Sequence, residues 1–181
     1  MPPGPQPAPF AVVPDAPRRL RQLIDRDQAN LICLDCKANL ADHASLTYGV
    51  FICEECAEMH LQELGPQVSF IRSLFKNSSV ALAHWDEYSL RMMETAGGNH
   101  NFRKFMMFYK LRCKETYKRY RHKAAVYYSK QLRTQVDGLH MAFKPPSHHF
   151  THEEVAYFTS IGIDPANFFF LKRDEEESTI S

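Results

Sequence analysis

Apolar and polar residues follow a helical period in several stretches of the chain. Near the N-terminus, Leu20, Leu23 and Ile24 form a narrow apolar stripe, which predicts an amphipathic helix. Asp15 precedes this stripe and can cap the helix, and Pro17 suits its first turn. The pattern therefore places the start of the first helix near residue 15.

Five further helices are predicted downstream. They cover 54–64 (ending at Gly65-Pro66), 85–95 (ending at Gly97-Gly98), a segment capped by Asn99 or Asn101, a long segment through Tyr117 and Tyr128, and a short one from a capping box at 151–154 to Gly162. In the third and fourth of these, aromatic residues recur at helical spacing, and we interpret them as core residues. They are Phe102, Phe105, Tyr109, Tyr117, Tyr120 and Tyr128.

Two stretches have the pattern of β-structure. Residues 45–47 and 50–52 flank Tyr48-Gly49, which predicts a hairpin whose second strand leads into Cys53. Residues 67–72 partly alternate apolar and polar side chains, as a half-buried strand does.

Composition and the positions of helix-breaking residues divide the 181 residues into three parts. A proline-rich extended arm is expected over 1–14, one domain over 15–140, and a C-terminal extension over 141–181 with a short helix, aromatic residues at 168–171 and an acidic end at 174–177. The chain is 44% hydrophobic and 12% aromatic, which is enough to bury a core. We expect neither a secretory signal nor a membrane-spanning helix, because no apolar run of the required length is present.

Positive charge is concentrated between residues 103 and 133. This segment holds eleven of the 22 Lys and Arg and a single acid, Glu115, although the net charge of the whole chain is only +1. Such a segment can attract phosphates, anionic lipid headgroups or an acidic protein face. A solvated helix face whose counter-charges lie elsewhere in the fold explains it equally well, so the sequence leaves both explanations open.

Four of the five cysteines form two Cys-x-x-Cys pairs separated by 16 residues. The pairs are Cys33 with Cys36 and Cys53 with Cys56, whereas Cys113 stands alone. Two such turns can complete a closed tetrahedral sulfur shell, so we predict one structural Zn²⁺. Iron–sulfur ligation and a pair of disulfides are the alternatives, and disulfides need an oxidising compartment. We interpret the neighbouring His43 and His60 as ordinary side chains, because four cysteines already complete the shell.

The cysteine pairs and the residues around them resemble the Arf GTPase-activating protein (ArfGAP) family. The resemblance covers about residues 17–138, in order. It is carried by 31–36, 44–53, 54–56, His60, 64–65, 69–73, Trp85, Met93, 97–99, 102–105 and 123–132. It implies an α+β fold, in which helices surround a small antiparallel sheet with a four-cysteine zinc finger, and it implies activation of an Arf-family GTPase as the family's activity.

The chain departs from the family where the resemblance places its chemistry. The family's catalytic arginine falls five residues after the last zinc cysteine, and this chain has Leu61 there. An arginine finger places a fixed positive charge against the transferred phosphoryl group, and leucine has neither charge nor donor. His43 replaces a family tryptophan, and the segment between Ser73 and Trp85 is about six residues longer than usual. A second family arginine is kept, as Arg72.

These observations predict a zinc-binding ArfGAP-like domain with no catalytic residues of its own, serving as an interaction module or a structural subunit of a larger assembly. The alternative is an active GTPase-activating protein for Arf-family GTPases in membrane traffic. Nucleic-acid binding is disfavoured, because the aromatic residues have core spacing and form no stacking platform.

The expected partners are a protein assembly, an Arf-family GTPase or an anionic membrane surface. The resemblance implies an intracellular protein in the cytoplasm or at the periphery of Golgi or endosomal membranes. A subunit of an organellar complex, for example a mitochondrial one, is the alternative.

Overall fold

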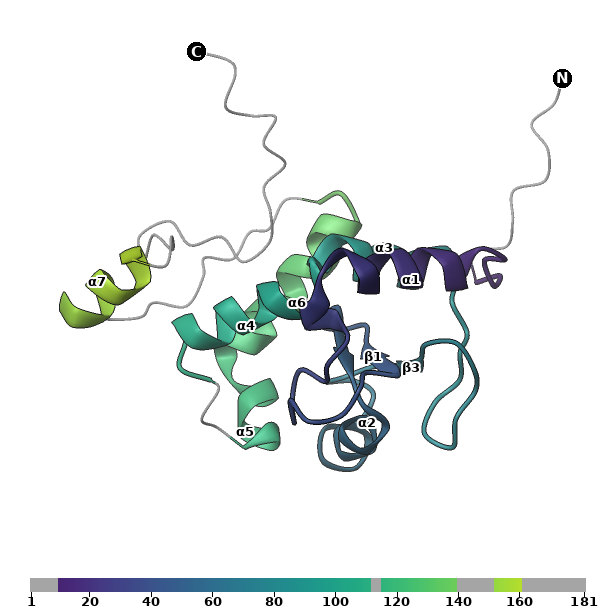
Figure 1. Cartoon of the computed structure of the whole chain (residues 1–181), viewed down its shortest axis with the longest axis horizontal. Coiled ribbons are helices and arrows are strands. Elements are labelled where there is room, and N and C mark those ends of the chain that lie inside the picture. The colour runs from purple at the N-terminus through teal and green to yellow at the C-terminus, as the bar shows by residue number, and fades with distance from the viewer. Residues whose placement is uncertain (1–9, 112–114, 140–151, 161–181) are drawn as a thin grey trace, which may run out of the picture.

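A small antiparallel sheet lies at the centre of the molecule, with helices around it (Figure 1). The computed structural model describes residues 10–111, 115–139 and 152–160. The sheet order is β2-β1-β3, in which β1 (His43–Ser45) pairs antiparallel with both β2 (Val50–Ile52) and β3 (Ile71–Ser73). The expected α+β class is confirmed. The aromatic residues at 168–171 and the acidic end at 174–177 lie outside the described residues.

The helices follow the predicted order along the chain. They are α1 (Ala16–Arg26), α2 (Glu54–Met59), α3 (Glu87–Ala96), α4 (Gly98–Phe108), α5 (Thr116–Arg121), α6 (Lys123–Val136) and α7 (His152–Ser160), with a 3-10 turn η1 (Gln28–Asn30) and a π-helical turn η2 (His60–Leu64) that continues α2. The predicted stops at Gly65 and Gly97 are confirmed, and both glycines have a φ of 77°, which other residues rarely adopt. None of the described helices is long and apolar enough to cross a bilayer.

The predicted hairpin is confirmed, and the geometry of its turn explains why a glycine stands at position 49. Ser45 pairs with Val50, so 46–49 form the connection. Gly49 has a φ of 62°, and a Cβ there would lie 2.0 Å from the Cβ of Ala96 in α3. The predicted strand over 67–72 is wrong at its start, since β3 begins only at Ile71. The N–H groups of residues 68 and 69 bond back to the carbonyl of Gly65, which makes a turn instead.

The start of α4 differs from the prediction. Gly97 is its N-cap, and Asn99 lies fully buried in the first turn. The Asn99 Oδ1 atom accepts the N–H of Phe51 at 2.7 Å, and Nδ2 donates to the carbonyls of Ala29, Ile32 and Phe51 at 3.0 Å each. These distant backbone groups occupy the side chain of Asn99. Asn101, the other expected cap, lies inside α4, and its Nδ2 atom donates to the carbonyl of Ala96 at 2.9 Å.

The long helix predicted through Tyr117 and Tyr128 is two helices. His122 separates α5 from α6, with ψ at 142°, and its ring accepts the N–H of Ala124 at 3.1 Å. Tyr120 and Tyr128 are buried as predicted, but Tyr117 is 49% exposed. The interpretation of Tyr117 as a core residue is therefore wrong.

Two apolar clusters lie on opposite faces of the sheet. Along β2, Val50 and Ile52 join one cluster and Phe51 joins the other, because successive side chains of a strand point to opposite faces. The first cluster contains Tyr48, Phe102, Phe105, Tyr120 and Tyr128. The second contains Trp85 and the apolar stripe of α1, which confirms the predicted amphipathic helix.

Candidate metal centre and its surroundings

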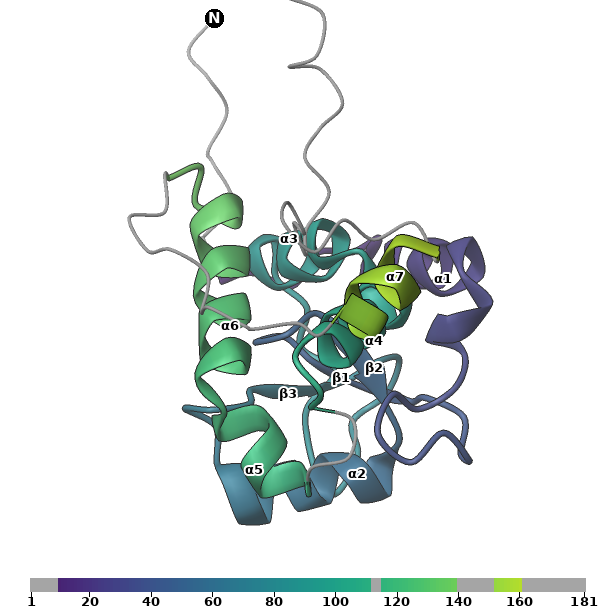
Figure 2. The same cartoon turned by 90° about the vertical axis from the view of Figure 1, so that its left-hand side faces the viewer.

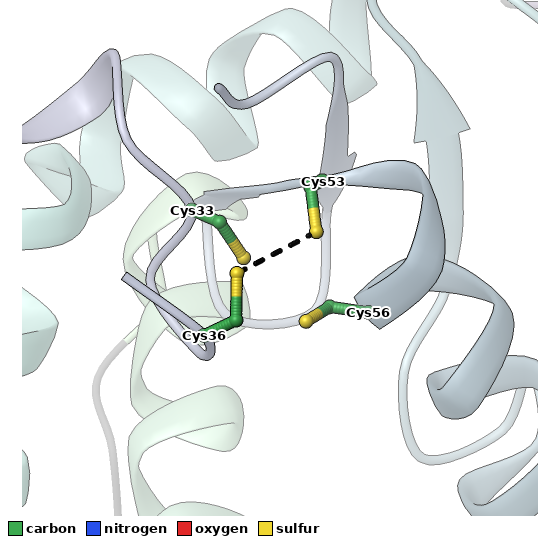
Figure 3. Close-up of side chains that lie close together, drawn as sticks. All are labelled: Cys33, Cys36, Cys53 and Cys56. Atoms are coloured by element: carbon green, nitrogen blue, oxygen red, sulfur yellow. Dashed lines mark hydrogen bonds between the residues drawn. The ribbon is translucent and has the colours of Figure 1, made fainter. Parts of the chain in front are cut away.

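The four paired cysteines meet at one point. Cys33 and Cys36 lie in the loop after η1, Cys53 follows β2, and Cys56 is in the first turn of α2 (Figure 3). Their sulfur atoms all lie within 4.8 Å of one another, and the Sγ atoms of Cys36 and Cys53 are 3.8 Å apart. Tetrahedral zinc with Zn–S bonds of about 2.3 Å holds its sulfurs about 3.8 Å apart. The donor set and its spacing therefore fit the single closed zinc site expected from the sequence.

The close spacing of the sulfurs shifts the pKa values of the thiols in opposite directions. A hydrogen bond from the Cys56 thiol lowers the pKa of Cys33 to about 5, whereas the same contact raises the pKa of Cys56 and burial raises the pKa of Cys53 to about 12. Asn39 Nδ2 lies 3.6 Å from the Cys53 sulfur and orients it. Four thiolates at this spacing repel one another, so they coexist only around a positive ion.

Asp35, within the first cysteine pair, ties the metal loop to the rest of the fold. Its Oδ1 atom accepts the Tyr120 hydroxyl at 2.6 Å and Arg119 Nη1 at 3.0 Å, and its Oδ2 atom lies 2.7 Å from His60 Nε2. Burial by itself disfavours the charged carboxylate, but hydrogen bonds from His60 and Tyr120 keep the pKa of Asp35 below its usual value. The carboxylate therefore stays ionised and holds α5 and η2 against the cysteine loop.

His60 belongs to this hydrogen-bond network and lies outside the cysteine shell. Its ring is fully buried, and Nδ1 lies 2.7 Å from the hydroxyl of Ser69, which is itself 2.7 Å from that of Ser45. In a neutral ring that donates from Nε2 to Asp35, Nδ1 accepts the Ser69 proton. No local spacing in the sequence signals this chain of partners, which come from three separate segments.

Leu61 follows His60 directly in η2. Its side chain is 36% exposed and has no polar atom. Because the preceding His60 is held by two hydrogen bonds, the backbone at Leu61 is fixed relative to the cysteine loop. The backbone position from which the side chain of residue 61 projects is therefore defined, whichever residue stands there.

Arg72 on β3 is a half-buried cation that forms no ion pair within the described residues, although Asp86 is close enough to act on its charge. Its guanidinium carbon lies 4.5 Å above the ring centre of Phe70, a favourable cation–π contact. The Nε atom is buried without a hydrogen-bond partner, and burial lowers the pKa of Arg72. Within the described residues, no carboxylate forms an ion pair with it.

The other two departures from the family contact one another. His43 Nε2 lies 2.7 Å from the hydroxyl of Ser78, in the longer segment between β3 and Trp85, and His43 Nδ1 lies 2.7 Å from Asp42 Oδ1. This set has the connectivity of a Ser-His-Asp triad. However, the N–H groups of Val80 and Ala81 already bond to the Ser78 oxygen, and the His43 ring is buried. We therefore interpret the His43–Ser78 hydrogen bond as a structural contact, which holds the segment between β3 and Trp85 to β1.

Ser78→Ala is expected to lower the free energy of unfolding by about 1–3 kcal/mol, because it leaves the buried His43 Nε2 without a partner. The matched control is Ser79→Ala. Ser79 is exposed and makes only a 3.4 Å contact to Glu54, so we expect a change within about 0.5 kcal/mol. Urea unfolding of both variants measures the two changes in the free energy of unfolding. Equal changes would contradict the structural role of the His43–Ser78 hydrogen bond.

Comparison with known proteins places this geometry in context. The family profile described as "Putative GTPase activating protein for Arf" matches residues 17–137. The chain is 35% identical over 117 residues to ADP-ribosylation factor GTPase-activating protein 3 of Mus musculus, covering 65% of this chain and 20% of that protein. It is 45% identical over 65 residues to ADP-ribosylation factor GTPase-activating protein GCS1 of Saccharomyces cerevisiae, covering 36% of this chain and 18% of that protein.

These matches cover only part of the relatives. The chain spans about a fifth of the length of the curated relatives it matches. Among solved structures, that of a "putative GTPase activating protein for ADP ribosylation factor from Cryptosporidium parvum" has a TM-score of 0.50 and 22% identity, and the alignment covers 71% of this chain and 94% of that one. At this identity the likeness supports the fold alone.

Proposed function

Since the chain belongs to the Arf GTPase-activating protein family, we propose that it is a non-catalytic member of it, acting as an interaction module or as a structural subunit of a larger assembly. The observation that carries the proposal is the aliphatic, partly exposed side chain of Leu61. It stands where the resemblance places the family's catalytic arginine, on a backbone that is fixed by the neighbouring His60.

The chemical reason is the charge that develops during GTP hydrolysis. An arginine finger stabilises negative charge on the transferred phosphoryl group, and it contributes about 10³- to 10⁵-fold in rate. Leu61 offers no charge and no hydrogen-bond donor. The neighbouring Gln62 is exposed and has a side-chain amide that can orient a water molecule, but it cannot supply a positive charge.

The residues that build the scaffold are retained, which supports a role in binding. Cys33, Cys36, Cys53 and Cys56 would hold Zn²⁺, which cross-links the loop after η1 to the start of α2 when bound. Asp35 then connects this loop to α5 through Tyr120 and Arg119. Cross-links of this kind favour one arrangement of the surface, which lowers the entropic cost of docking.

Co-purification tests the positive half of the proposal. We expect the native protein, isolated with its endogenous partners and sized by gel filtration, to elute as a complex that holds at least one other protein in a fixed ratio. Mass spectrometry of that fraction identifies the partner. Elution of all the protein at the size of the free chain would contradict a role as a module or subunit.

An active GTPase-activating protein is the second candidate, and Arg72 is the observation that favours it. Its guanidinium forms no ion pair within the described residues, and only the more distant Asp86 acts on it, so part of its charge is available to a bound anion. If the wild-type chain accelerates GTP hydrolysis and Arg72→Ala removes the acceleration, the second candidate is correct. The matched control is Arg18→Ala, an exposed arginine of α1, which should leave any acceleration unchanged.

A further inference from the structure

The exposed side chains of α5 and α6 form a strongly basic surface. Over residues 116–136 the sequence has six Lys and Arg and no Asp or Glu. Arg119 turns inward to Asp35, and the other five are exposed. We call these five, together with Tyr117 and Val126, the basic face: Tyr117, Lys118, Arg121, Lys123, Val126, Lys130 and Arg133. Figure 2 shows that α5 and α6 follow one another along one edge of the molecule.

Most of this charge is not neutralised by neighbouring acids. On α1, by contrast, Arg19 pairs with Glu87 and Glu94 at 2.7 and 2.8 Å. On the basic face, Lys118 lies 3.7 Å from Glu115, and both side chains are well exposed. Arg121, Lys123 and Arg133 have no carboxylate within 4 Å in the described part of the chain. The alternative explanation was a solvated helix face balanced by acids elsewhere in the fold. Within the described residues, these three positions have no such acid beside them.

Tyr117 and Val126 make the face amphipathic as well as basic. Tyr117 is 49% exposed, and the guanidinium of Arg121 lies 4.6 Å from its ring centre. Val126 is 38% exposed between Lys123 and Lys130 on the outer stripe of α6. Tyrosine beside arginine is a combination found at the headgroup level of membranes, where the ring is partly buried and the hydroxyl stays wet.

We propose that the basic face docks on an anionic phospholipid surface. The two helices are about 9 and 21 Å long, so their charges are spread over more than one Debye length, which is about 8–10 Å. Charge spread over such a length matches the uniform negative potential of a lipid leaflet. A site for single-stranded nucleic acid uses several exposed aromatic rings for stacking, whereas Tyr117 is the one tyrosine of α5 and α6 that is well exposed.

The proposal does not depend on whether the domain activates a GTPase. A basic face of this kind is a single, reversible membrane signal, because each Lys or Arg near an anionic leaflet strengthens binding by about fivefold. Removing three charges is therefore expected to weaken binding by about a hundredfold. Added salt should have a similar effect, because it screens the attraction.

The test is vesicle co-sedimentation of the 181-residue, zinc-loaded chain. We compare vesicles of phosphatidylcholine alone with vesicles containing about 30% phosphatidylserine, at about 0.1 and 0.5 M salt. The wild type should bind the phosphatidylserine vesicles at low salt and release them at high salt. The triple variant Lys118→Gln, Arg121→Gln, Lys123→Gln should lose this binding by about a hundredfold.

A matched control removes the same charge elsewhere. The variant Arg18→Gln, Arg26→Gln, Lys76→Gln changes three exposed basic residues outside the basic face, and it should keep most of the binding. Tyr117→Ala should weaken vesicle binding several-fold while leaving the net charge unchanged. The thermal melt and the zinc content of each variant establish that it is folded.

Three results would overturn the proposal. One is equal binding to vesicles with and without phosphatidylserine. Another is an equal loss in the two triple variants, which would show that only the net charge matters. The third is binding to a soluble polyanion such as heparin or duplex RNA in the absence of vesicle binding, which would assign the face to another class of partner.

Discussion

Leu61→Arg is expected to raise the rate of GTP hydrolysis by an Arf-family GTPase several hundredfold above the rate with the wild-type chain. The new guanidinium would begin from a backbone fixed by His60 and its partners Asp35 and Ser69. Position 61 is 36% exposed, so the longer side chain needs no rearrangement of the core. Several hundredfold corresponds to about 3.5 kcal/mol of barrier.

We expect the gain to fall short of the full contribution of an arginine finger, about 10³- to 10⁵-fold. The His43 substitution and the longer segment held by Ser78 also distinguish this chain from its family. The matched control is Gln62→Arg, which adds the same charge at the next exposed position of η2. Single-turnover hydrolysis with excess variant gives both rates, and equal rates for the two variants would contradict the assigned position of the finger.

Cys53→Ser is expected to release the metal and abolish the cooperative thermal melt. A structural zinc contributes about 10–16 kcal/mol to folding, which is as much as the whole stability of a typical domain, about 5–15 kcal/mol. The loss should spread beyond the cysteine loop, because Asp35 links that loop to Tyr120 and Arg119 of α5. Circular dichroism and zinc analysis of the purified variant measure both effects.

Cys113→Ser provides the matched control for the same chemical change. Cys113 is the one cysteine without a Cys-x-x-Cys partner, and it lies outside the described residues. We expect that variant to keep one zinc per chain and a melt close to that of the wild type. A Cys53→Ser variant that melts cooperatively with no zinc bound would contradict a structural role for the metal.

The sequence predicted best those features that depend on nearby residues. The two cysteine pairs predict a site through local turns, and the structure brings their sulfurs within 4.8 Å of one another. Gly65 and Gly97 end their helices as expected, because left-handed backbone is a local requirement. The apolar stripe of α1 is buried for the same reason, since helical period alone decides which side chains share a face.

The features that the sequence missed depend on distant partners. Asn99 can cap a helix by its chemistry, but it is used by backbone groups 48 to 70 residues away. The break at His122 turns α5, so the helical spacing from Tyr117 to Tyr128 no longer describes one face. The contacts of His60 with Asp35 and of His43 with Ser78 join segments 25 and 35 residues apart. No local pattern encodes such contacts. Of these residues, only His43 was singled out in advance as a substitution, because it replaces a family tryptophan.

The central claim is that this chain keeps the zinc-stabilised fold of its family while Leu61 removes the charge that catalysis requires. The most direct test is the single-turnover rate of GTP hydrolysis by an Arf-family GTPase in the presence of excess wild-type, zinc-loaded protein. The account predicts the intrinsic rate of the GTPase, unchanged by the added protein. An acceleration of about 10³-fold or more, the range of an intact arginine finger, would contradict it.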